Sequence, residues 1–373
     1  MNLTLTEDQE LIQDTARKFL HSRMGSANIR SMSNDPKGFS QGLWDEITEQ
    51  GWVGLMLPQA YGGSGSGFFE TCLLAEQLGW HAVPSPFVPT VLGGLVISQF
   101  GTPAQKDEWL PSICQGRIVS YVPPASLGHW ADSESSVIAT RTGNQIRLDG
   151  SAFFVPFAHV ASEILIAAKW SSHEDSKHVV LLLDQNAPGL AQTAVETVGS
   201  DRPHHLELTG VVVPETRILG AGDKGSDVLN ALLTWGASAT AVQMAGSAQR
   251  VLDLSVEYVR QRQQFGRPIG SFQAVQHHCA NMAIDVLTAR FLAYEAAWRL
   301  SAGLSADTEV SMAKAWTSDS YRRVMALAHQ VHGAIGFTKD HDLHFFLRDA
   351  LAASVQFGES DVHWDRIASL LGL

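Results

Sequence analysis

Two short segments in the last third of the chain combine an arginine, glutamines and glycines in patterns that could contact a phosphorylated ligand. They are YVRQRQQFGRPIGSFQAVQ, with Arg262, Phe265 and Gln273, and QVHGAIGFTKD, with Gln330, Gly333 and Ala334. An arginine offers charge and planar donors to phosphate oxygens, and a glycine lets the backbone approach a ligand closely. Taken singly, the same residues suit a solvated helix-end cation and ordinary turns, so both interpretations stay open on residue chemistry alone.

Other catalytic chemistries have weaker support in this sequence. The candidate metal-binding histidines are His204 with His205, His277 with His278, and His341 with His344. No acid joins them at a zinc-ligand spacing such as HExxH, so we expect no metal site. The three cysteines are far apart and form no CxxC pair, which favours free thiols. A Ser-His-Asp triad would need a nucleophile elbow, and the pattern indicates none.

The elements that would position these segments fall into three parts. Thr6 suits a helix N-cap with Gln9 in the capping-box position, and helical spacing continues to about residue 117. Residues 118–222 alternate β-branched or aromatic with polar residues, and Thr142-Gly143-Asn144 is typical of a hairpin turn. Residues 223–373 contain long amphipathic helices. We therefore predict an α+β fold: an N-terminal helical domain, a central β-barrel-like domain and a C-terminal four-helix bundle.

Composition limits the possible partners. The chain has 373 residues, 45% hydrophobic and 17% charged, which is an ordinary globular composition. Its net charge of -12 argues against nucleic-acid binding, although a phosphorylated ligand needs only a few local cations. The N-terminus lacks the features of a signal peptide, and no segment approaches the ~20 apolar residues of a membrane span. We expect a cytoplasmic protein without a membrane partner.

The two segments also carry a family resemblance. The order Arg-x-x-Phe-Gly and then Gln, followed by Gln-x-x-Gly-x-x-Gly-Phe and by Arg348-Asp349-Ala350, resembles the acyl-CoA dehydrogenase family. The resemblance extends over essentially the whole chain and is weakest in the middle. One departure is Ala334, which stands where the family has a second glycine.

This resemblance implies an FAD-dependent enzyme that dehydrogenates an acyl-CoA thioester between its α and β carbons. In the family, the corresponding arginine contacts the pyrophosphate of the FAD in the neighbouring subunit. That implies an FAD-binding role for Arg262, with Phe265 and Gln273 nearby. Gln330, Gly333 and Ala334 would approach the ADP part. The expected assembly is a homo-oligomer, a dimer or tetramer, or else a heterotetramer with a related subunit.

The catalytic base of the family is a glutamate, which most members carry in a Tyr-Glu-Gly-Thr-like loop after the Arg-Asp-Ala segment. This chain reads SVQFGESDVHWDRIA there. Anchoring the alignment on Arg366-Ile367 places Glu359 at the base. Anchoring it on the aromatic-acid-glycine pattern places Phe357 there and leaves no base. Glu359 is the candidate catalytic residue, and both alignments stay open.

The flavin-ring pocket departs from the family as well. The turn at the start of the β-domain reads VPPASLGHWADS, and the family's Trp-Ile-Thr appears as Phe154-Val155-Pro156. Proline has no hydroxyl for the usual contact, although Phe154 could lie against the ring. Two alternatives to a complete dehydrogenase follow. One is a non-catalytic partner subunit, as in heteromers that resemble steroid side-chain acyl-CoA dehydrogenases, and the other is a flavin-dependent monooxygenase on the same fold.

Overall fold

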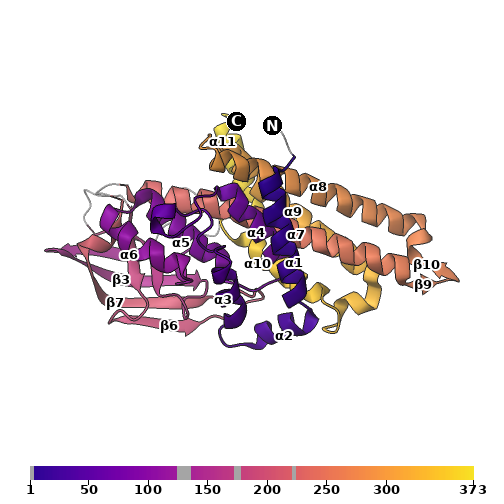
Figure 1. The fold of residues 1–373 in the computed structure, drawn as a ribbon, viewed down its shortest axis with the longest axis horizontal. Helices are drawn as coiled ribbons and strands as arrows, with labels where there is room; N and C mark the ends of the chain where they lie inside the picture. The colour runs from indigo at the N-terminus through magenta and orange to yellow at the C-terminus, as the bar shows by residue number, and fades with distance from the viewer. Residues whose placement is uncertain (1–3, 124–135, 172–177, 221–223) are drawn as a thin grey trace. The chain divides into compact units, whose positions relative to one another are not determined.

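The computed structural model describes residues 4–123, 136–171, 178–220 and 224–373. The chain divides into two compact units. The helical unit comprises residues 1–30, 68–83 and 237–373, and the sheet unit comprises residues 31–67 and 84–236. Along the chain, helices come first, then a sheet and then helices again, as predicted (Figure 1). The boundaries predicted at residues 117 and 222 stay a prediction.

The helical unit gathers the two ends of the chain. It consists of α1 (Glu7–Arg23), α4 (Phe68–Trp80), residues 237–261 of α7 (Gly225–Gln261), β9 (Gln263–Gln264), β10 (Arg267–Pro268), η3 (Ile269–Ser271), α8 (Gln273–Ser301), α9 (Asp307–His332), η4 (Gly333–Phe337), α10 (Leu343–Val355) and α11 (Ser360–Leu370). Helix α2 (Ser26–Asn34) crosses the division between the units. The predicted four-helix bundle is confirmed in α7, α8, α9 and α10.

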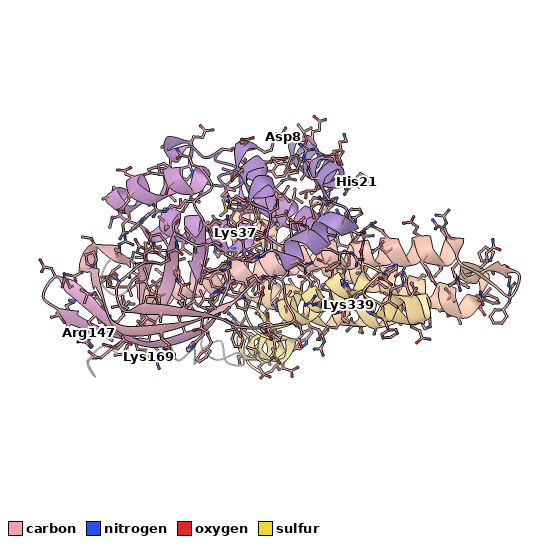
Figure 2. The ribbon with its side chains drawn as sticks, turned by 90° about the horizontal axis from the view of Figure 1, so that it is seen from below. Asp8, His21, Lys37, Arg147, Lys169 and Lys339 are labelled. Carbon is pink, nitrogen blue, oxygen red and sulfur yellow. The ribbon has the colours of Figure 1, made fainter. Side chains whose placement is uncertain are left out.

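The first helix begins where its sequence predicts. The hydroxyl of Thr6 accepts a hydrogen bond from the backbone N–H of Gln9, and the Gln9 side chain accepts one from the backbone of Thr6. This reciprocal capping satisfies two N–H groups that a helix start would leave without partners. Asp8 and His21, near the two ends of α1, are both exposed (Figure 2). The buried face packs on α4, which ties the N-terminus to the bundle.

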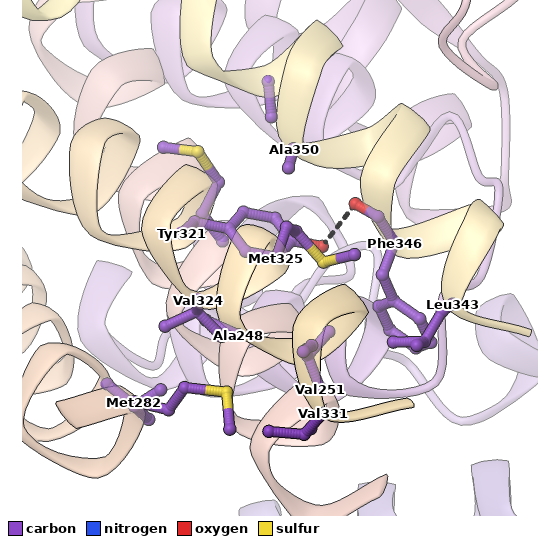
Figure 3. Close-up of a cluster of buried hydrophobic side chains, with 14 of the residues drawn as sticks. Ala248, Val251, Met282, Tyr321, Val324, Met325, Val331, Leu343, Phe346 and Ala350 are labelled. Atoms are coloured by element: carbon purple, nitrogen blue, oxygen red, sulfur yellow. Dashed lines mark hydrogen bonds between the residues drawn. The ribbon is translucent and has the colours of Figure 1, made fainter. Parts of the chain in front are cut away.

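The core of the bundle is a cluster of aliphatic, methionine and aromatic side chains from α7, α8, α9 and α10 (Figure 3). Tyr321 is completely buried in it, and its hydroxyl donates to the backbone oxygen of Phe346 at 3.0 Å. A buried phenol needs such a partner because an unpaired hydroxyl is costly in an apolar interior. The contact fixes α10 against α9.

The sheet unit contains α3 (Gln41–Glu49), η1 (Gln59–Tyr61), α5 (Phe87–Phe100), α6 (Pro103–Cys114), η2 (Glu215–Arg217) and eight strands. The strands are β1 (Val119–Tyr121), β2 (Ile138–Thr142), β3 (Gln145–Val155), β4 (Glu163–Trp170), β5 (His178–Asp184), β6 (Leu190–Ala194), β7 (His204–Pro214) and β8 (Ile218–Leu219). Seven of them follow the order β6-β7-β3-β2-β4-β5-β8, and β1 pairs with β4.

The predicted hairpin is confirmed, because Thr142 pairs with Gln145 across a turn in which Gly143 has a φ of 62°. A positive φ at this position is what glycine supplies without steric cost. The sheet is mixed, since β4 pairs in parallel with β1 and β2 and antiparallel with β5. Among the described strands the path ends at β6 and β8 without closing, so the unit is an open sheet rather than a barrel.

No helix among the described residues is long and apolar enough to cross a membrane. The cytoplasmic location expected from the sequence stays a prediction.

Candidate functional site

The segment after α7 forms a short, exposed hairpin arm, which we define as residues 262–273. Strands β9 and β10 pair antiparallel, and Phe265 and Gly266 at the tip have φ angles of 55° and 76°. Two consecutive residues with positive φ are the geometry of a type I′ turn. The backbone N–H of Ile269 donates to the oxygen of Arg262 at 2.8 Å and closes the base of the arm.

The side chains of the arm point outward. Phe265 is 90% exposed, an unusual position for a phenylalanine, and its ring meets that of Phe272 edge-on at 5.9 Å. Arg262 and Gln273 are both exposed. In the part of the chain that the structure describes, the Arg262 guanidinium makes no ion pair or side-chain hydrogen bond, so its five donors are available to a ligand.

The second predicted segment begins at the end of α9. Gly333 has φ 62° and ψ -142°, a conformation that a residue with a Cβ adopts only under strain. Gln330, Gly333 and Ala334 are exposed. A Cβ built on Gly333 would meet no atom within 4 Å, so it is the backbone conformation there that favours glycine. The turn therefore presents its backbone to solvent, as the approach of a ligand requires.

An aromatic contact brings these two segments together. The ring of Tyr258, in the last turn of α7, stacks on that of His332, the last residue of α9, with centroids 4.5 Å apart. Burial lowers the pKa of His332 to about 4, so the ring is neutral at neutral pH. Its Nδ1 lies 2.8 Å from the oxygen of Ala328. Arg262 and Gly333 thus leave the bundle from adjoining helix ends.

An open groove of about 470 Å³ lies beside the arm. Its lining comes from the end of α7, from the chain before α8 and from the start of α8: Val256, Val259, Arg260, Pro268, Gly270, Val275, Gln276 and Cys279. The walls are mainly apolar, and Arg260 contributes a cation. Burial raises the pKa of the Cys279 thiol, which keeps it protonated and unreactive at neutral pH.

The loop with the two candidate base positions lies elsewhere in the helical unit. Glu359 is exposed and occupies the N-cap position of α11, where its side chain makes no capping hydrogen bond. Phe357 is buried, with 6% of its surface exposed. Figure 1 shows α11, which follows Glu359, well away from the β9–β10 hairpin. The structure therefore brings Arg262 and Gly333 near each other but does not add Glu359 to them.

Phe154 belongs to the sheet unit. It is 43% exposed and has a φ of 58°, next to a register shift between β3 and β7. Such a bulge turns a side chain out of the regular alternation of a strand. The neighbouring Phe153 stacks on His205 with centroids 4.1 Å apart. Most of the VPPASLGHWADS turn, residues 124–133, lies outside the described residues.

Sequence reasoning missed two residues, Tyr258 beside the hairpin arm and Lys314 beside the turn that contains Phe357. Tyr258 is part of the quoted motif, but nothing in the sequence pairs it with His332. Lys314 lies in the small-residue run SMAKAWTS of α9 and is completely buried. A lysine inside such a run is a signal, because lysine is almost never fully buried without partners. Within the described residues, no group of acids, histidines and cysteines could hold a metal ion.

Comparison with known proteins accounts for these features. Residues 6–117 match the family model of the acyl-CoA dehydrogenase N-terminal domain, and residues 223–372 match that of the C-terminal domain. The chain belongs to the acyl-CoA dehydrogenase family. Among its relatives is the acyl-CoA dehydrogenase FadE27 of Mycobacterium tuberculosis, which is 32% identical over 93% of this chain and 92% of that protein.

Solved structures of the acyl-CoA dehydrogenase family agree with the fold. Butyryl-CoA dehydrogenase from Megasphaera elsdenii superposes with a TM-score of 0.92 at 26% identity, over 100% of both chains. A chain of the ChsE4-ChsE5 complex from Mycobacterium tuberculosis superposes with a TM-score of 0.91 at 30% identity, over 100% of this chain and 99% of that one. The family consists of FAD-dependent oxidoreductases that act on acyl-CoA and form oligomers.

The exposed parts of the helical unit fit that cofactor. FAD carries a pyrophosphate, which needs cationic or N–H donors and close backbone approach. Arg262 has an unengaged guanidinium, and Gly333 presents a backbone without a side chain. The departure at Ala334 adds one methyl group at an exposed position.

Proposed function

We propose that this chain is one subunit of an oligomeric FAD-dependent acyl-CoA dehydrogenase and that its hairpin arm contacts the FAD of a neighbouring subunit. The observation that carries the proposal is the exposed arm itself. Its tip has a phenylalanine that is 90% exposed, and its base has an arginine without a partner. On an isolated chain the Phe265 ring stays in water, whereas a second subunit would bury that ring and an anionic ligand would pair with the arginine.

The proposed roles follow from position and chemistry. Arg262 would bind the pyrophosphate, with Phe265 and Gln273 beside it on the arm. The backbone of Gly333, with Gln330 and Ala334, would lie against the ADP part. Phe154, which β3 turns outward, would lie against the flavin ring. When bound, FAD supplies the oxidation of the acyl chain, and the residues named here bind and orient it.

The arginine is the direct test of this function. Arg262→Ala removes one cation with up to five N–H donors. Charge-assisted hydrogen bonds contribute about 1.5–3 kcal/mol, so FAD affinity should fall roughly 10- to 100-fold. Arg322 is an exposed arginine of α9. Arg322→Ala serves as the control and should leave the affinity for FAD unchanged. FAD retained per subunit is read from flavin absorbance after gel filtration, and equal retention in both variants would refute the arm's role.

A second candidate function is that of a partner subunit which completes the FAD site of a related chain but supplies no base. The buried Phe357 and the exposed Glu359 favour it. Support also comes from the likeness to a chain of the ChsE4-ChsE5 complex, whose name gives two different components. Purification of the chain alone with one FAD per subunit and full turnover would exclude this candidate.

A further inference from the structure

The turn between α10 and α11 has an unusual backbone. Phe357 has a φ of 56° and Gly358 a φ of 100°, so two successive residues leave the ordinary right-handed and extended regions. For phenylalanine this conformation is strained and persists only where the surroundings impose it. As a result the Phe357 side chain is buried, and the Glu359 side chain, two residues later, is exposed.

Lys314 is one source of that constraint. It lies in the first half of α9 with no exposed surface, and its Nζ is 2.8 Å from the oxygen of Gly358 and 3.0 Å from that of Ser354. A third contact goes to the hydroxyl of Ser318 at 3.1 Å. Three oxygen atoms therefore surround the buried amino group, the kind of partner set that lets a lysine be buried. Two of these acceptors are backbone oxygens, one at the end of α10 and one in the turn.

His363 is the other source. It is completely buried in the first turn of α11, and its Nε2 lies 3.0 Å from the oxygen of Phe357. A carbonyl oxygen only accepts, so Nε2 must carry the proton. Burial, with a further contribution from the charge of Lys314, lowers the pKa of His363 to about 3. The ring is neutral at working pH and acts as a fixed N–H donor.

We propose that Lys314 and His363 are positioning residues, which together hold the turn of residues 354–359 in one conformation. They bind the backbone oxygens of Ser354, Phe357 and Gly358, and thereby keep the side chain of residue 357 inside and that of residue 359 outside. The pair comes from two helices, so the turn is fixed from both sides. Neither side chain needs to touch substrate for this role.

The consequence for catalysis rests on the proposed function. In acyl-CoA dehydrogenases this turn is where the base is expected, and Glu359 and Phe357 are its two candidate positions. Lys314 and His363 hold residue 357 with its side chain buried, and this residue is a phenylalanine, which cannot accept a proton. With residue 357 at the base position, the turn of this chain supplies no base and leaves proton removal to another subunit.

Hydrogen–deuterium exchange of the full chain tests whether Lys314 and His363 hold the turn, and it needs neither cofactor nor substrate. Lys314→Met keeps the length of the side chain but removes its donors, and Lys18→Met changes an exposed lysine of α1 as the control. Peptides covering residues 355–363 should exchange at least about tenfold faster in Lys314→Met than in wild type or the control. Peptides of α8 should not change. Unchanged protection of residues 355–363 would overturn the proposal.

Two variants of His363 test the proposal if Lys314→Met fails to fold. His363→Phe removes the donor to Phe357 without adding charge, and His363→Gln restores an N–H donor near the same place. Faster exchange in the first and recovery in the second support positioning by a hydrogen bond. Equal exchange in both would show simple packing and refute it. Because exchange needs no FAD, an Arg262→Ala variant that still binds FAD would refute the proposed function and leave this inference intact.

Discussion

The ring of Tyr258 stacks on that of His332 with an angle of 22° between the planes, and this contact joins the two segments that we assign to FAD. Tyr258 precedes Arg262 by one helical turn, and His332 directly precedes Gly333. This aromatic pair therefore helps to set the relative position of the arginine and the glycine turn, together with Val259 and Val331, which lie in the same buried cluster.

This contact predicts a selective effect of Tyr258→Ala. Aromatic pairs contribute about 0.5–1.5 kcal/mol beyond their burial, so FAD affinity should fall by roughly 2- to 10-fold as the two segments loosen. Tyr258→Phe keeps the ring and should bind FAD as wild type does. Fluorescence titration of the apoprotein with FAD measures both variants. Equal loss in Tyr258→Phe would show that the hydroxyl, not the stacking, matters.

The exposed tip of the arm predicts that Phe265→Ala weakens subunit assembly but leaves the stability of the isolated chain unchanged. The ring is 90% exposed, so its removal should change the melting temperature of the isolated chain by no more than about 1 °C. Contact with a neighbouring subunit should weaken, because exposed aromatics act as anchors when a partner covers them. Sedimentation velocity across a concentration series reads this out, and an unchanged dissociation constant would argue against the arm as an interface element.

Lys314 predicts a pH dependence of stability. Burial lowers its pKa in the folded chain from 10.5 to about 7, while Glu359 and Asp319 oppose the shift. Between these two values the unfolded chain binds more protons, so the free energy of unfolding rises with pH. The slope approaches about 1.4 kcal/mol per pH unit. His363, with its pKa near 3, titrates below this window.

Urea denaturation at pH 7.5 and pH 9 measures the effect as a difference between wild type and Lys314→Met. Wild type should gain stability over this pH range relative to the variant, because the methionine at position 314 cannot titrate. Parallel behaviour of the two proteins would show that Lys314 keeps an ordinary pKa, and the burial argument would fail.

The turn predicts that Glu359→Gln leaves substrate-dependent flavin bleaching unchanged in the assembled enzyme. Glu359 is exposed at the N-cap of α11, and no capping hydrogen bond depends on its charge. Anaerobic stopped-flow absorbance with a panel of acyl-CoA thioesters measures the rate. Abolished bleaching would identify Glu359 as the base and would require the turn to rearrange on binding substrate.

Features set by neighbours in the sequence could be predicted. The capping pair of Thr6 and Gln9 and the hairpin at Gly143 depend on residues one to three positions apart, and both are confirmed.

Features set by distant residues could not be predicted. Tyr258 and His332 meet only because two helix ends adjoin, and Lys314 of α9 contacts the turn between α10 and α11, forty or more residues later in the chain. The sequence left the choice between Glu359 and Phe357 open for the same reason. An alignment counts positions, whereas the direction of each side chain follows from the positive φ angles at Phe357 and Gly358.

Lys314 and His363 hold the turn only through main-chain oxygens, those of Ser354, Phe357 and Gly358. Every amino acid has such an oxygen, so these contacts do not depend on which side chain occupies position 357. The shape of the turn and its reactivity can thus change independently during evolution. A gene duplicate can lose or regain an acid there by a single codon change while it keeps the same backbone, which is a simple route by which a self-sufficient enzyme becomes one half of a pair.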